Sequence, residues 1–77
     1  MPVSERKRVQ RLLKRSEELR RQMKRREVSD QEIQELVRAL NKGVERIESE
    51  IRKGLLRKRL SFWEDRLNER SRFAKTT

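Results

Sequence analysis

Apolar residues recur with helical spacing along most of the chain. Steps of three and four residues place the first group on one stripe, together with one serine. This stripe comprises Val9, Leu12, Ser16, Leu19 and Met23. The only proline is residue 2 and the only glycines are residues 43 and 54, so few residues interrupt a helix. The pattern predicts an all-α protein whose first helix covers about residues 4–27, with Ser4 as its N-cap.

A second helix is predicted from a start signal just after Val28. Ser29 and Glu32 have the spacing of a capping box, in which each residue bonds the backbone N–H of the other. Ile33 stands where a hydrophobic staple with Val28 would close. We expect this helix over about residues 30–53. Its stripe comprises Ile33, Val37, Leu40, Val44, Ile47 and Ile51.

The pattern shifts in phase after residue 51. Gly54 is a natural helix-ending residue, and a new stripe follows with Leu56, Leu60, Trp63 and Leu67. We therefore predict a third helix over about residues 55–72. The alternative is one long helix over residues 30–72 that drifts in phase at Gly54. Residues 1–74 would form one helical domain, and residues 75–77 a frayed tail.

The first two helices are joined by a short turn, which favours an antiparallel hairpin. A chain this short with only 31% apolar residues buries little core, and without Cys or His it has no disulfide and no zinc site. We therefore expect a homodimer with a four-helix-bundle core, joined through the stripe from Ile33 to Ile51. Gly43, beside that stripe, either permits a close helix crossing or has no structural role.

The three predicted helical segments differ in net charge: the first and third are basic, and the second is nearly neutral. The chain carries a formal +10. Residues 1–28 hold 11 basic and 4 acidic side chains, residues 29–54 hold 5 and 6, and residues 55–77 hold 7 and 3. Such an excess costs self-repulsion in a compact state, which indicates a polyanionic partner. Nucleic acid fits, because its phosphates release counterions to Lys and Arg.

The basic residues of the first helix follow the face opposite its apolar stripe. At a rise of 1.5 Å per residue they would extend about 27 Å, close to one turn of a duplex. We predict phosphate contacts from Lys7, Arg11, Lys14, Arg15, Arg21 and Arg25, with further contacts from Arg38, Asn41, Lys42, Arg57 and Lys58. Trp63 lies on an apolar stripe and is expected in the core, whereas Phe62 lies beside that stripe.

The residues for most other functions are missing. Without His, Cys or Tyr, most general-base and nucleophile arrangements cannot be built, so we expect no enzyme activity and no cofactor or metal. No apolar run approaches the roughly 20 residues of a membrane span. We expect an intracellular, cytoplasmic protein. The lack of base-reading motifs favours duplex RNA, which proteins bind by shape and backbone.

The helix order, the length, the Met1-Pro2 start and the local sequence Leu40-Asn41-Lys42 resemble the small RNA-silencing suppressors of insect nodaviruses. That resemblance implies a dimeric bundle lying along double-stranded RNA in the host cytoplasm, with Lys42 as a contact. The alternative function is a coiled-coil adaptor that binds a partner helix or an acidic protein surface.

Overall fold

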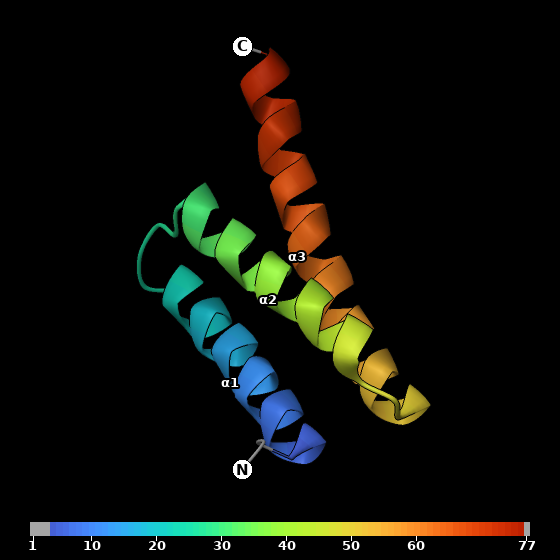
Figure 1. The fold of residues 1–77 in the computed structure, drawn as a ribbon. Coiled ribbons are helices and arrows are strands. Elements are labelled where there is room, and N and C mark those ends of the chain that lie inside the picture. Colours follow the sequence, from blue (N-terminus) through green and yellow to red (C-terminus); the bar gives the residue numbers. More distant parts are fainter. Residues whose placement is uncertain (1–3, 77) are drawn as a thin grey trace.

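The computed structural model describes residues 4–76, and the side chains of residues 4–72. Within that range the chain forms three helices and no strand: α1 (Glu5–Met23), α2 (Asp30–Arg46) and α3 (Glu50–Thr76). Helix α1 and helix α2 run in opposite directions, and α3 reverses again, crosses behind α2 and extends past the hairpin (Figure 1). The prediction of an all-helical chain that starts with a hairpin is confirmed.

The turn between α1 and α2 is built largely as the sequence predicted. Ser29 Oγ accepts the backbone N–H of Glu32 at 3.2 Å, and Glu32 Oε2 accepts the backbone N–H of Ser29 at 2.9 Å. Val28 and Ile33, the predicted staple, are both fully buried. Helix α1 begins after its predicted cap, Ser4. It ends at Met23, four residues early, because residues 24–26 already form the turn.

The second break is not where the sequence placed it. Helix α2 ends at Arg46, Ile47 is extended, and α3 starts at Glu50, so both the helix over 30–53 and the continuous helix over 30–72 are wrong. Gly54 lies inside α3 and ends no helix. Early reversal lets Leu56 and Trp63 fold back against the hairpin, where both are fully buried. Each such burial contributes about 1.5–3 kcal/mol.

Contacts from other helices hold this second break in place. Ser49 caps α3 by accepting the backbone N–H of Arg52 at 3.5 Å. Glu5, at the start of α1, accepts the backbone N–H of Glu48 at 2.7 Å and the Arg52 guanidinium at 2.6 Å. These bonds lower the pKa of the Glu5 carboxyl, because both donors favour its charged form. One carboxylate thereby fixes the position of α3 against α1.

The stripe predicted as a dimer interface is mostly the core of the single chain. Ile33, Leu40 and Ile47 are buried by the chain itself, and Val37 and Val44 pack against them half-buried. Helix α3 covers this stripe, so a second copy is not needed to cover it. Ile51 is the exception, with 80% of its surface exposed. The structure therefore shows most of this stripe packed within the single chain, and the homodimer stays a prediction.

Trp63 is the centre of the contact between α1 and α3. Its ring is fully buried, as predicted, and its indole N–H donates to Ser16 Oγ at 2.8 Å. Ser16 is the buried polar member of the first stripe, and this bond satisfies it. Phe62 meets Trp63 edge to face with ring centres 5.0 Å apart, and the Arg20 guanidinium lies over Phe62 at 5.0 Å.

Helix α3 also runs further than predicted. It begins five residues before residue 55 and continues to Thr76, so residues 75 and 76 of the expected tail continue the helix. Thr77 lies outside the described residues. Arg70 fixes the far part of α3 to the hairpin turn, donating to Val28 O at 2.6 Å and to Asp30 Oδ1 at 2.7 Å. Among residues 4–76, no helix is long and apolar enough to cross a membrane.

Candidate nucleic-acid interface

The predicted cations of α1 are all exposed on its surface, away from the core. Within the described part of the chain, Lys7, Arg11, Lys14, Arg15 and Arg25 form no ion pair. Arg21 does, with Glu17 at 3.4 Å, but both side chains are mostly exposed and the pair is weak. The outward side of α1 is therefore a basic surface whose charge the fold leaves largely unbalanced.

Arg25 was predicted to lie on the first helix, but the structure places it outside α1. It lies beyond the end of α1, in the turn. The turn nevertheless keeps it beside the outward side of α1, where it lines one shallow hollow with Lys14, Arg21 and the acidic residues Glu17 and Glu18. We call Lys7, Lys14, Arg21 and Arg25 the outward face of α1.

A groove between α1 and α2 gathers a second set of cations. One end of this groove is lined by several cations, and we call it the basic end. Its residues come from both helices and from Ile47, the first residue of the linker (residues 47–49) between α2 and α3. Arg8, Arg11 and Arg15 line it from α1, Lys42 and Arg46 line it from α2, and the apolar floor comprises Leu12, Ala39, Gly43 and Ile47. None of the described side chains of α3, up to residue 72, lines it. The antiparallel packing of α1 and α2 thus brings Lys42, a predicted phosphate contact, into the same groove as Arg11 and Arg15.

Gly43 sets how closely the helices approach at this floor. A side-chain carbon at Gly43 would collide with the end of Leu12 and lie 3.4 Å from Leu56 Cδ1. Helices α1, α2 and α3 therefore meet at this glycine, and the close crossing that the sequence suggested there is present. Leu12, whose side chain takes the space beside Gly43, is part of the same apolar floor.

The one acidic residue that lines this basic end is already engaged. Glu5 lines the groove, but its two carboxylate oxygens bond the Glu48 N–H and Arg52. None of the five cations at the basic end forms an ion pair among the described residues. Sequence reasoning missed Arg8 and Arg46 as members of this set. Only the pairing of α1 with α2 brings them together.

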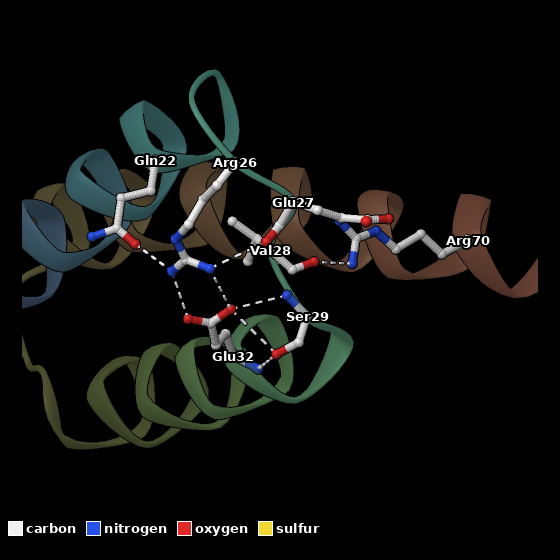
Figure 2. Close-up of polar contacts among 7 residues, drawn as sticks. All are labelled: Gln22, Arg26, Glu27, Val28, Ser29, Glu32 and Arg70. Carbon is white, nitrogen blue, oxygen red and sulfur yellow. Dashed lines mark hydrogen bonds and ion pairs between the residues drawn. The ribbon is translucent and has the colours of Figure 1, made fainter.

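The opposite end of the same groove, near the turn, has mixed charge. Arg15, Glu18, Gln22, Glu32 and Glu35 line it, over Leu19 and Leu36. Of these charged residues, Glu32 is the bonded one: Arg26 of the turn donates to its two carboxylate oxygens at 2.7 and 3.2 Å and to Gln22 Oε1 at 2.6 Å (Figure 2). Arg15, Glu18 and Glu35 form no ion pair among the described residues.

That clasp changes the acid–base behaviour of its carboxylate. The Arg26 guanidinium, with help from the Ser29 N–H, lowers the pKa of Glu32 to about 2, while the same contact raises the pKa of Arg26. Figure 2 shows the clasp on one side of the turn and Arg70 of α3 holding the Val28 carbonyl on the other. The turn end of the groove is therefore structural.

The remaining predicted contacts lie apart from these surfaces. Arg38 lines a separate hollow of α2 with Gln31, Gln34 and Glu35. Asn41 is exposed on α2, and Arg57 and Lys58 are exposed on α3. The structure thus concentrates the predicted site on α1 and on Lys42.

The chain matches no known protein family, no curated protein and no solved structure, so its function must be argued from its own residues.

Proposed function

We propose that this protein is a non-catalytic nucleic-acid-binding protein whose outward face of α1 lies along the phosphates of a duplex. The supporting observation is the unpaired positive charge of that face. Lys7, Lys14 and Arg25 have no acidic partner in the described residues, in a chain of net charge +10. Phosphates reward such charges by releasing counterions.

The shape of α1 supports a duplex rather than a single strand. From Lys7 to Arg21 the helix rises about 21 Å, a length over which a rigid rod meets several phosphates. Single strands are usually held by exposed aromatic rings that stack on bases. Trp63 is fully buried, and Phe62 packs against Trp63 on α3 with Arg20 over its ring. The outward face of α1 therefore offers charge but no stacking platform.

Duplex RNA is the proposed ligand. Proteins recognise it through backbone shape, phosphates and 2′-hydroxyls, a task that needs exposed cations on a rigid element and no base-reading motif. A role in suppressing RNA silencing, implied by the resemblance noted above, would follow from coating such duplexes. The proposal does not depend on a dimer, because the cations of this face all belong to one chain.

Binding should be measured by fluorescence anisotropy against duplex RNA, duplex DNA and single-stranded RNA of about 25 nucleotides, more than two helical turns. We expect the tightest binding to duplex RNA, with little dependence on sequence. The decisive variant is the triple Lys7→Gln, Lys14→Gln, Arg25→Gln. It should weaken binding and make the logarithmic salt dependence shallower by about 3, one for each lost phosphate contact.

A matched triple with the same loss of charge is Arg57→Gln, Lys58→Gln, Arg66→Gln, on exposed positions of α3. It also tests the predicted contacts of Arg57 and Lys58. We expect a smaller loss of affinity from this variant. Equal losses from both triples would show that only net charge matters, and equal affinity for all three nucleic acids would contradict duplex recognition.

A further inference from the structure

The basic end of the groove has a feature that the outward face of α1 lacks: an apolar floor. Phosphates are bound by charged and polar groups, so phosphate binding does not explain the apolar residues Leu12, Ala39 and Ile47 between the cations. A surface that is apolar in the middle and basic at both edges complements a ligand that is apolar in the middle and acidic at both edges. An amphipathic helix with acidic flanks has that arrangement.

The fold places this groove where a further helix fits. Helix α3 packs against the hairpin through Leu56 and Trp63, and none of its side chains described up to residue 72 lines the groove. The two helices on either side of the groove are antiparallel, as in four-helix bundles (Figure 1). Ala39, a small and half-buried residue of the floor, leaves room for another backbone to approach closely.

The charges around the groove indicate that the molecule bound there is acidic. All five rim cations lack an ion-pair partner among the described residues, and the one acid in the lining, Glu5, is committed to Arg52 and the Glu48 N–H. A second copy of this chain does not fit, because its net charge is +10 and its helices present exposed cations. The occupant must be a different, acidic chain.

We infer that the basic end of the α1–α2 groove binds an acidic amphipathic helix of a partner protein, which lies across the half-buried Leu12 and Ala39 with its carboxylates on Arg8, Arg15 and Arg46. This helix-in-groove mode takes its affinity from apolar anchors three and four residues apart. Its acidic flanks fix the partner's orientation and speed its association. The site is distinct from the outward face of α1 and holds whether or not that face binds nucleic acid.

The probe is a synthetic peptide of about 20 residues, long enough to form a helix, with Leu at helical spacing and Glu at both flanks. Its control is a scrambled peptide of identical composition, which keeps the charge and loses the apolar stripe. At about 150 mM salt, where loose charge attraction is screened, we expect the amphipathic peptide to bind at least about tenfold more tightly. Equal binding of the two peptides would overturn the inference.

Location is tested by backbone amide NMR on the unaltered protein, which requires no variant to fold. The peptide should shift the amides that line the basic end of the groove. Shifts centred instead on the exposed apolar residues of α3, Ile51 and Leu55, would overturn the proposed site.

Ala39→Trp then fills the floor from a half-buried position and should weaken peptide binding by about tenfold or more through a steric clash. Its affinity for duplex RNA should stay within about twofold of the unaltered protein, because Ala39 is not on the outward face. If Ala39→Trp weakens RNA binding as much as peptide binding, and RNA displaces the peptide, the groove is a nucleic-acid site and the inference fails.

Discussion

The two ends of the α1–α2 groove use charge in opposite ways. At the turn end, Arg26 and Glu32 bond each other and the backbone, so charge there fastens the helices together. At the basic end, Arg8, Arg11 and Arg46 bond no acid among the described residues. There the helices approach one another closely because Gly43 has no side chain. The Arg26–Glu32 pair holds the turn end, whereas the five cations that line the basic end pair with no acid among the described residues and remain available to a ligand.

The largest effect should come from filling the crossing at the basic end. Gly43→Val would force its methyl groups against Leu12 and Leu56, so we expect the free energy of unfolding to fall by about 1–3 kcal/mol. Gly54→Val is the matched control, because a side-chain carbon there meets nothing within 4 Å. It should be neutral or slightly stabilising, since valine forms helix somewhat better than glycine.

Urea unfolding followed by circular dichroism measures both glycine variants. Equal effects at Gly43 and Gly54 would show that the three helices do not depend on close approach at Gly43. The contrast between the two ends of the groove would then rest on charge alone.

At the turn end, Ser29→Ala removes the side-chain half of the capping box. The Glu32 N–H loses its acceptor, and we expect the free energy of unfolding to fall by about 1 kcal/mol. Ser61→Ala, at an exposed position inside α3, serves as the control and should change stability by no more than a few tenths of a kcal/mol. A Ser29→Ala variant as stable as the Ser61→Ala control would contradict the structural role of this end.

Acid should weaken the contact between Arg26 and Glu32 at the turn end. The pKa of Glu32 is lowered to about 2 from an ordinary value of 4.5, so its ionised form stabilises the fold above about pH 4.5. That stabilisation is lost as the pH falls from about 4.5 to about 2. Glu32→Gln lacks the titration, so its stability deficit relative to the unaltered protein should be largest near pH 7 and shrink through that window.

Thermal unfolding of Glu32→Gln and the unaltered protein at a series of pH values measures this deficit. A deficit that stays constant from pH 7 to pH 2 would show that Arg26 does not hold the carboxylate in solution.

The smallest effect should come from neutralising the basic end. Arg8→Gln with Arg11→Gln removes no ion pair and relieves repulsion, and Arg8 also lies near the positive end of the α1 dipole. We expect the free energy of unfolding to stay unchanged or to rise, within about 0.5 kcal/mol. Arg26→Gln, the matched change at the turn end, should lower it. A loss from the Arg8 and Arg11 pair would show that these cations support the fold.

Local patterns predicted the parts of this fold that local bonds create. The capping box at Ser29 and Glu32 involves residues three apart, and the α1 stripe is a matter of helical spacing, so both could be read from the sequence. The break at residues 47–49 could not. Its Glu48 N–H is bonded by Glu5, which lies 43 residues away, and the apolar spacing runs through the break to Ile51. Ser49, followed by an acid, was the one weak local sign of a new helix start.

The candidate site divides in the same way. Helical spacing put the predicted cations of α1 on its exposed surface, whereas the basic end of the groove exists only because α1 and α2 pack together. Arg8 and Arg46 belong to different helices, and no spacing along the chain relates them. The apolar stripe of α2 was correctly seen as an interface, but its partner is α3 of the same chain, because the early reversal at residue 47 returns Leu56 and Trp63 to it.

The buried indole of Trp63 gives this protein a built-in optical reporter. It is the chain's only tryptophan, and the chain has no tyrosine, so the near-ultraviolet emission comes from one site. That site lies between α1 and α3, with its N–H bonded to Ser16. Emission should shift to longer wavelength when α3 leaves the hairpin and stay nearly constant when a ligand enters the groove, which Trp63 does not line. The emission wavelength of Trp63 therefore distinguishes the detachment of α3 from the hairpin from the binding of a partner in the groove.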